Sequence, residues 1–181
     1  MYGTAQSVPI RETHPLNAQS PYAATKIAAD QLAMSFAAAY GLPATVVRPF
    51  NTFGPRQSAR AVIPAIIAQL LGGVDQLQLG ALHPTRDFTF VSDTVAGFIA
   101  ALQSTEGVGK VANLGTGHEV TIQQTARLIM EIIGREVPII GAEERMRPQA
   151  SEVERLCADN ALAKAWWGWS PKLAGELGLR E

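Results

Sequence analysis

The chain has 181 residues, with 15 basic and 16 acidic side chains and a formal net charge of -1. A chain this close to neutral offers no basic surface for nucleic acid or an anionic membrane, so we expect neither as a partner. Hydrophobic residues make up 47% of the chain and Cys157 is the only cysteine, which predicts one globular cytoplasmic unit without an intrachain disulfide.

The predicted elements alternate between helices and strands, which favours an α/β fold. Ser20 and Pro21 are typical of a helix start, Ser92 is expected to cap a later helix, and Thr121 with Gln124 fits a capping box. In chain order we expect a loop over 1–19, a helix over 21–40, a strand over 44–48, a helix over 60–71, a strand over 76–80, an extended segment over 87–91, a helix over 93–102, a strand over 111–114, a helix over 121–134, a strand over 137–140 and a last helix between 159 and 168.

Three further features are not expected: a membrane helix, a signal peptide and a metal site. The apolar run over 61–74 is too short for a membrane helix and is interrupted by Pro64 and Gln69. Residues 1–12 lack the basic start and apolar core of a signal peptide. The histidines lie far apart in the sequence, without cysteine or carboxylate partners at ligand spacing, so we expect no metal site; they are His14, His83 and His118.

The start of the first predicted helix carries a tyrosine and a lysine, Tyr22 and Lys26, four residues apart. This spacing places both side chains on one face of the helix. A nearby ammonium stabilises a phenolate, so such a pair is able to exchange protons with a substrate hydroxyl near neutral pH. Taken alone the motif is weak evidence, because tyrosine and lysine are common on half-exposed helices.

A series of short motifs surrounds this pair, and their order makes the pattern specific. They are Tyr2-Gly3, Ser20-Pro21-Tyr22 with Lys26, Arg48-Pro49-Phe50-Asn51, Gly54-Pro55-Arg56, Arg86-Asp87-Phe88, Asn113-Leu114-Gly115 and Gly168-Trp169-Ser170. The ordered set resembles the extended short-chain dehydrogenase/reductases of the NAD-dependent epimerase/dehydratase family, over nearly the whole chain. Within that family it looks most like the nucleotide-sugar 4,6-dehydratases.

The resemblance implies the C-terminal portion of a doubly wound, NAD(P)-binding Rossmann-like fold with a smaller substrate-binding region. Residues 1–60 would be the remainder of the dinucleotide-binding domain. Residues 61–181 would mainly bind the nucleotide sugar, with some elements returning to the sheet. The family's N-terminal Gly-x-x-Gly-x-x-Gly turn, which approaches the cofactor pyrophosphate, has no counterpart here. We therefore expect NAD to be the family cofactor and expect this chain alone to bind it poorly.

Roles for individual residues also follow from the resemblance. Tyr22 would take the proton of the sugar 4-hydroxyl, and Lys26 would bind the nicotinamide ribose. Pro49 and Phe50 would pass the nicotinamide, so both are expected to contact the cofactor with Tyr22 and Lys26. The residues expected to bind the substrate are Asn51, Arg56, Val62, Pro64, Arg86 and Arg147, of which the last two would bind the diphosphate because a guanidinium matches its oxygens at two points.

Five of the expected substrate contacts have a structural alternative. Asn51 could bond to the backbone of its own turn, Arg86 and Arg147 could form surface salt bridges, and Val62 and Pro64 could belong to the core. Asp93 is expected to be only a helix-start carboxylate. The three tryptophans near the C-terminus are expected to pack the last helix onto the core; they are Trp166, Trp167 and Trp169.

Three functions remain open at this point. The first is a nucleotide-sugar 4,6-dehydratase that oxidises C4, removes water from C5–C6 and returns the hydride to C6. The second is a nucleotide-sugar 4-epimerase similar to UDP-glucose 4-epimerase, which would form the same 4-keto intermediate. The third is a non-catalytic remnant that binds a sugar nucleotide or forms oligomers. The family's acidic pair, which separates the first two, would lie before Met1.

The helix over 21–40 carries apolar side chains that need a covering partner. In the family this helix helps to form a dimeric four-helix bundle, so the resemblance implies a homo-oligomer. The side chains are Ile27, Leu32, Phe36 and Tyr40.

Overall fold

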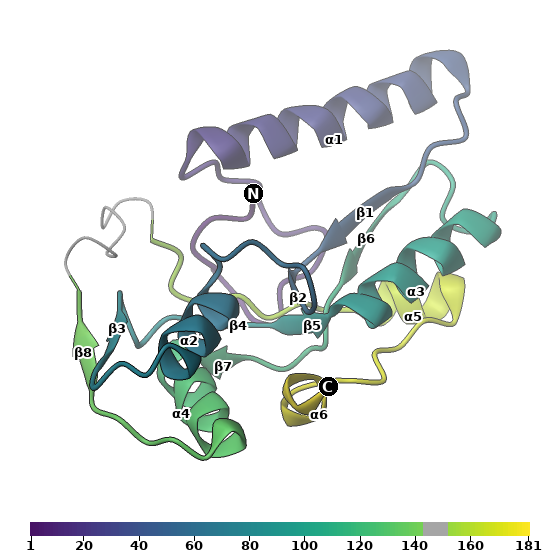
Figure 1. Ribbon diagram of the computed structural model, residues 1–181. Helices are drawn as coiled ribbons and strands as arrows, with labels where there is room; N and C mark the ends of the chain where they lie inside the picture. Colours follow the sequence, from purple (N-terminus) through teal and green to yellow (C-terminus); the bar gives the residue numbers. More distant parts are fainter. Residues whose placement is uncertain (143–151) are drawn as a thin grey trace.

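The computed structural model describes residues 1–142 and 152–181 and has the mixed α/β architecture that the sequence predicts (Figure 1). Within these residues no helix has both the length and the apolar character needed to cross a bilayer. The elements are α1 (Pro21–Tyr40), β1 (Val46–Pro49), β2 (Asn51–Phe53), α2 (Val62–Leu71), β3 (Leu77–Leu79), β4 (Thr85–Arg86), β5 (Phe88–Phe90), α3 (Val91–Gln103), β6 (Val111–Leu114), β7 (Val120–Thr121), α4 (Ile122–Ile133), β8 (Ile139–Gly141), α5 (Ala161–Trp167) and α6 (Glu176–Arg180).

Short ladders connect strands that are distant in sequence. The pairs β1–β6, β2–β5 and β3–β8 are parallel, and β4–β7 is antiparallel. The Phe50 N–H donates to the Leu114 carbonyl at 2.8 Å, so the β1–β6 ladder extends to the residue before β2. Asn51 therefore lies where the chain leaves one ladder and enters the next, beyond the carboxyl end of β1.

The main core lies between α2, α4 and the short strands. It includes Ile66 and Leu70 from α2, Leu77 from β3 and Ile129 from α4, all of them at most 3% exposed. Burial of such side chains contributes roughly 1.5–3 kcal/mol each, so this cluster stabilises the part of the chain that follows β2.

A second, smaller core confirms the predicted packing for two of the three C-terminal tryptophans, Trp167 and Trp169. Trp169 is buried with Leu114, and its indole Nε1–H donates to the Asp93 carbonyl at 2.9 Å. The Asp93 carboxylate accepts hydrogen bonds from the backbone N–H groups of Lys172 (2.9 Å) and Leu173 (2.8 Å). Asp93 thus does more than face a helix start, because it anchors the segment after α5.

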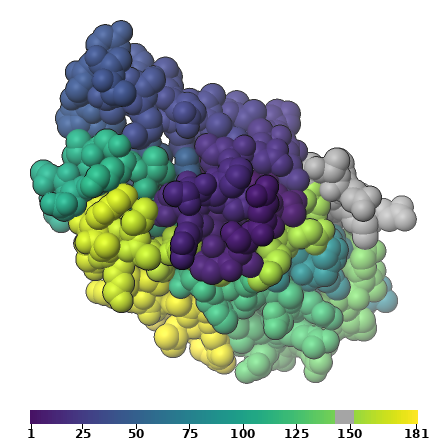
Figure 2. Space-filling view, turned by 180° about the vertical axis from the view of Figure 1, so that it is seen from behind, coloured from purple at the N-terminus to yellow at the C-terminus, as the bar shows by residue number. Residues whose placement is uncertain are grey.

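The N-terminal loop predicted over 1–19 lies across one face of the molecule, where Figure 2 shows it in dark purple beside the yellow-green segment that follows residue 152. An isolated parallel bridge joins Ile10 to Ala158. The Ile10 N–H donates to the Cys157 carbonyl at 2.7 Å, and the Asp159 N–H donates to the Ile10 carbonyl at 2.9 Å. The returning segment, residues 152–160, is therefore held along the N-terminal loop.

Helix α1 begins and ends where the sequence predicts. The Ser20 hydroxyl accepts a hydrogen bond from the Ala23 N–H, and Gly41 ends the helix in the left-handed region at φ 66°. Within α1, Ala23 alone is buried, whereas Leu32 is 60% and Tyr40 78% exposed. Figure 1 shows α1 at one side of the fold, with one long face uncovered.

One predicted cap is wrong and another is confirmed. Helix α3 begins at Val91, with Phe90 as its N-cap and no side-chain capping bond, so Ser92 lies inside the first turn. At the start of α4, Thr121 and Gln124 form both bonds of the capping box. The second pattern succeeded because two residues three positions apart must agree, whereas a lone serine is weak evidence.

Candidate functional site

Two open clefts share Asn51. The tyrosine cleft, about 370 Å³ in volume, is bordered by the start of α1, the end of β1, the first residues of the N-terminal loop and the returning segment. The arginine cleft, about 320 Å³, lies between α2, β3, β4 and the same returning segment. The tyrosine cleft contains Met1, Tyr2, Gly3, Tyr22, Arg48, Pro49, Phe50, Asn51, Thr52, Val153 and Leu156. The arginine cleft contains Asn51, Arg60, Val62, Ala65, Leu79, Gly80, Ala81, Pro84, Arg86, Phe88, Ile122 and Glu152.

The predicted proton-exchange pair consists of one residue that lines the tyrosine cleft and its neighbour on α1. Tyr22 is 70% exposed and lines the cleft, while the Lys26 ammonium lies 5.4 Å from the centroid of the Tyr22 ring. Contact of this kind places the ammonium charge against the aromatic face. The four-residue spacing therefore brings the two side chains together, as the sequence predicts.

A buried polar network supports the wall behind this pair. Arg48 on β1 donates from Nε to the Asp30 carboxylate on α1 at 2.7 Å, and from Nη1 to the Tyr2 hydroxyl at 2.8 Å. The Tyr2 hydroxyl donates in turn to Oδ1 of Asn113 on β6 at 2.6 Å. Burial would lower the pKa of Arg48, but the bonds and charges of Tyr2 and Asp30 outweigh it and raise the pKa. For Tyr2, burial raises the pKa, which keeps this hydroxyl protonated.

The predicted diphosphate arginine, Arg86, lines the arginine cleft from a buried position. Its guanidinium donates from Nη2 to the Glu152 carboxylate at 2.8 Å. Nη1 donates to the carbonyls of Thr85 (2.8 Å) and Val153 (2.7 Å). These bonds fix the guanidinium at the cleft wall and bring it together with Asn51 and Val62.

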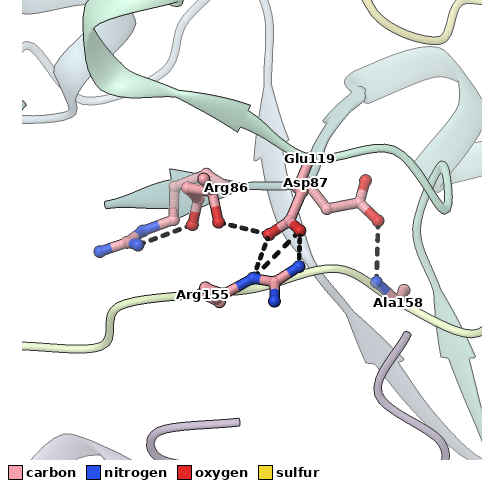
Figure 3. A network of polar contacts seen from close by, with 6 residues as sticks. Arg86, Asp87, Glu119, Arg155 and Ala158 are labelled. Atoms are coloured by element: carbon pink, nitrogen blue, oxygen red, sulfur yellow. Dashed lines mark hydrogen bonds and ion pairs between the residues drawn. The ribbon is translucent and has the colours of Figure 1, made fainter. Parts of the chain in front are cut away.

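A second polar network holds the returning segment in place (Figure 3). The fully buried Asp87 carboxylate accepts a hydrogen bond from the Ala158 N–H at 3.0 Å. The Glu119 carboxylate binds the guanidinium of Arg155 and the hydroxyl of Thr85, and the Arg155 bond is the main cause of the lowered pKa of Glu119. This network was not predicted from the sequence, although Asp87 lies inside one of the motifs that carried the resemblance.

The neighbouring cysteine has no nucleophilic role in this arrangement. Cys157 is buried, and burial raises the pKa of its thiol to about 11. A thiol is reactive mainly as the thiolate, so Cys157 is expected to remain inert near neutral pH.

Other predicted residues lie elsewhere. Arg56 and Pro64 line a separate, largely apolar groove of about 590 Å³ between α2, α4 and α6. Val62 and Pro64 differ by two positions at the start of α2, so a helix points them in different directions. Arg147 lies outside the described residues.

Three of the four residues predicted to contact NAD line one cleft: Tyr22, Pro49 and Phe50. They present a hydroxyl and apolar surface, which is chemistry compatible with a nicotinamide and its ribose. The sequence contains no Gly-x-x-Gly-x-x-Gly turn to receive the pyrophosphate. In the part of the chain that the structure describes, no three histidine, cysteine, aspartate or glutamate side chains gather as metal ligands.

Comparison with known proteins identifies the family. The family described as GDP-mannose 4,6 dehydratase matches residues 1–181. The chain is 34% identical over 180 residues to a dTDP-glucose 4,6-dehydratase of an Actinoplanes species, covering 99% of this chain and 52% of the relative. It is 32% identical over 182 residues to a UDP-glucose 4-epimerase of Mycolicibacterium smegmatis, covering 99% of this chain and 56% of the relative.

The fold agrees with this assignment. The structure of dTDP-glucose 4,6-dehydratase from Bacillus anthracis in complex with NAD matches with a TM-score of 0.88 and 27% identity, covering 99% of this chain and 56% of that chain. The chain spans about half the length of the curated relatives it matches. The chain therefore belongs to the NAD-dependent epimerase/dehydratase family of extended short-chain dehydrogenase/reductases, whose members act on nucleotide sugars.

Proposed function

We propose that this chain carries the catalytic Tyr–Lys pair and the nucleotide-sugar cleft of an NAD-dependent nucleotide-sugar 4,6-dehydratase. The observation that supports this most is the sharing of Asn51 between the two clefts. A ligand that runs past Asn51 would present its sugar to Tyr22 and its diphosphate to Arg86. The pairing of an acid/base with a buried arginine along one path is the arrangement that a diphosphate-linked sugar requires.

Each residue has a proposed role in the reaction. Lys26 would stabilise the phenolate form of Tyr22, and this phenolate would accept the proton of the sugar 4-hydroxyl and become a neutral phenol. NAD, when bound, would supply the hydride acceptor for C4. Asn51 would orient the sugar nucleotide at the junction of the clefts, and Arg86 would bind phosphate oxygens at two points in exchange for Glu152. Arg56, Pro64 and Arg147 remain predicted substrate contacts, although the first two lie on the apolar groove.

A 4-epimerase is the alternative within the same family. Relatives of both kinds match at similar identity, 34% for the dehydratase and 32% for the epimerase. The match of the GDP-mannose 4,6 dehydratase family over residues 1–181 favours the dehydratase. A 4-keto-6-deoxy sugar product would support the dehydratase, whereas a 4-epimer that retains its 6-hydroxyl would support the epimerase.

The exposed face of α1 supports a homo-oligomer. Leu32 is 60%, Phe36 46% and Tyr40 78% exposed on one helix, and the Phe36 and Tyr40 rings lie 5.4 Å apart. A contiguous apolar and aromatic surface of this kind is typical of a protein interface. A second copy of α1 would cover it.

Calorimetric titration of the 181-residue chain with UDP-, GDP- and dTDP-linked hexoses, and separately with NAD, tests the proposal. We expect a nucleotide sugar to bind, with NAD binding much weaker. Arg86→Lys keeps the charge but removes the two-point fork, so binding should weaken by about tenfold. Arg127→Lys is the matched control, because Arg127 is exposed on α4 outside both clefts. A folded chain that binds none of the nucleotide sugars would contradict the proposed function.

A further inference from the structure

Three ionisable side chains follow one another along a single face of α1. Tyr22, Lys26 and Asp30 are spaced by four residues, so each lies one turn from the next. Lys26 therefore has two neighbours that attract an ammonium: the Tyr22 ring on one side and the Asp30 carboxylate on the other. The Lys26 ammonium is found at the Tyr22 ring, 5.4 Å from its centroid.

The Asp30 carboxylate is bound by another partner. Arg48 on β1 donates to it from Nε at 2.7 Å, and the side chains of Arg48 and Asp30 are only 6% and 14% exposed. A charge-assisted hydrogen bond at this distance and burial is much stronger than an exposed lysine–aspartate pair on one helix, which contributes little to stability. The lysine-before-aspartate order is also the weaker of the two possible orders.

Contacts other than Asp30 hold the Arg48 guanidinium in place. Its Nη1 donates to the Tyr2 hydroxyl at 2.8 Å, and its guanidinium lies 5.2 Å from the centroid of the Tyr2 ring. The Tyr2 hydroxyl is anchored by Asn113 on β6. The position of Arg48 is thus determined by the β1–β6 ladder and the N-terminal loop rather than by α1.

The Arg48–Asp30 pair is also the main specific tie between α1 and the rest of the protein. Among the residues that the structure describes, no other α1 side chain forms an ion pair or a hydrogen bond to a different element. Ala23 is the one buried residue of α1, so apolar burial contributes little to holding α1 against the rest of the protein. The pair therefore determines how Tyr22 is presented to the tyrosine cleft.

We propose that Arg48 is a positioning residue: by binding Asp30 it prevents that carboxylate from pairing with Lys26, and so keeps the Lys26 ammonium at Tyr22. Without Arg48, the Asp30 carboxylate would have Lys26 as its nearest available cation along the helix. Lys26 would then turn away from Tyr22 toward Asp30. The inference concerns the pair used in the proposed function, but it describes a geometry that exists whether or not the chain turns over a sugar nucleotide.

Reductive ¹³C-methylation of the lysines provides the test, because dimethyllysine keeps its charge. The chain has four lysines, Lys26, Lys110, Lys164 and Lys172, so the methyl signals can be assigned with single Lys→Arg variants. In the unmodified sequence, the Lys26 methyl signal should be displaced upfield by the Tyr22 ring. Lys110 is an internal control for folding, because its ammonium lies 4.8 Å from the Trp166 ring centroid, away from α1.

Arg48→Met should shift the Lys26 signal to the position of an exposed lysine while the Lys110 signal stays in place. Adding Asp30→Asn to Arg48→Met should return the Lys26 signal, because the competing carboxylate is gone. A purely structural role for Arg48 predicts the opposite. The Lys26 signal of the double variant would then stay at the position of an exposed lysine, as in Arg48→Met. An unmoved Lys26 signal in Arg48→Met, or no return in the double variant, would overturn the proposal.

Two milder variants keep the test decisive if Arg48→Met also loses the Lys110 signal. Asp30→Asn alone should leave Lys26 at Tyr22, because Asp30 does not hold Lys26 in the native arrangement. Arg48→Lys should also leave it there, because an ammonium at position 48 still pairs with Asp30. If the Lys26 signal of either variant moves to the position of an exposed lysine while the Lys110 signal is unchanged, Arg48 does not act by occupying Asp30.

Discussion

The buried carboxylate of Asp87 accepts a hydrogen bond from the backbone N–H of Ala158 at 3.0 Å, although the two residues lie 71 positions apart. The same carboxylate accepts bonds from the Thr116 N–H, the Thr116 hydroxyl and the Gly117 N–H. It therefore joins the β4–β5 junction, the turn after β6 and the returning segment. Because that segment forms a wall of both clefts, one carboxylate supports the whole candidate site.

Asp87→Asn should lower the free energy of unfolding by about 3 kcal/mol, since an amide NH₂ faces a buried donor where a carboxylate oxygen accepted from it. Urea denaturation followed by tryptophan fluorescence measures the change. Asp75→Asn removes a carboxylate at an exposed position and should change stability by less than about 0.5 kcal/mol. Equal effects of the two substitutions would show that the Asp87 network contributes little.

Gly115 makes a close approach to the returning segment that leaves no room for a side chain. A Cβ at this position would lie 2.4 Å from the Ala158 Cβ and 2.8 Å from an Asp87 carboxylate oxygen. Gly115→Ala should therefore destabilise the fold by about 1–3 kcal/mol through overpacking. Adding Ala158→Gly removes the shorter of the two contacts, so thermal denaturation of the double variant should show partial recovery. A double variant that is less stable than Gly115→Ala would contradict this explanation.

Local patterns predicted the long elements well because several residues agree in each. Ser20 and Gly41 mark both ends of α1, and the Thr121–Gln124 capping box marks the start of α4. The strands β2, β4 and β7 and the helix α6 were not predicted as elements, since two to five residues carry too little periodicity. Their existence depends on partners far away in the sequence, which no local pattern reports.

Some contacts of the candidate site could also be predicted from local spacing, whereas others depend on distant segments. The Tyr22–Lys26 contact follows from helical spacing alone, so the sequence was sufficient to predict it. The sharing of Asn51 between two clefts depends on how β1 passes into β2 and on where the returning segment lies. The binding of Arg86 by Glu152 depends on that segment too. A local motif cannot predict a partner that lies 66 positions away in the sequence.

Acid should weaken the Glu119–Arg155 contact in a defined pH window. The Arg155 hydrogen bond lowers the pKa of Glu119 below its ordinary value of 4.5, so the folded protein binds this proton less tightly than the unfolded chain does. The contribution to stability is present above that ordinary value and is lost as the pH falls through the lowered value. The difference in unfolding free energy between the native sequence and Glu119→Gln should therefore be largest near about pH 6 and shrink below about pH 4.

Glu12 should show the opposite pH dependence. Its carboxylate accepts a hydrogen bond from the Asn113 N–H at 2.7 Å, but burial raises its pKa above the ordinary value of 4.5. The folded protein therefore binds this proton more tightly than the unfolded chain does, and stability is lost as the pH rises through that range. Glu12→Gln keeps an acceptor oxygen without the charge, so it should stabilise the protein near about pH 7 and have little effect near about pH 3. A loss of stability at pH 7 would contradict this sign.

The uncovered face of α1 should govern self-association. Phe36 is 46% exposed, so Phe36→Glu removes apolar surface and adds a charge without disturbing the core. We expect Phe36→Glu to shift the chain toward monomer in sedimentation velocity, with a thermal midpoint within about 2 °C of the native one at matched low concentration. Gln31→Glu is the matched control, because it adds the same charge at an exposed polar position on the same helix. If both variants dissociate alike, net charge rather than the apolar face controls association. A native chain that is already monomeric would contradict the predicted interface.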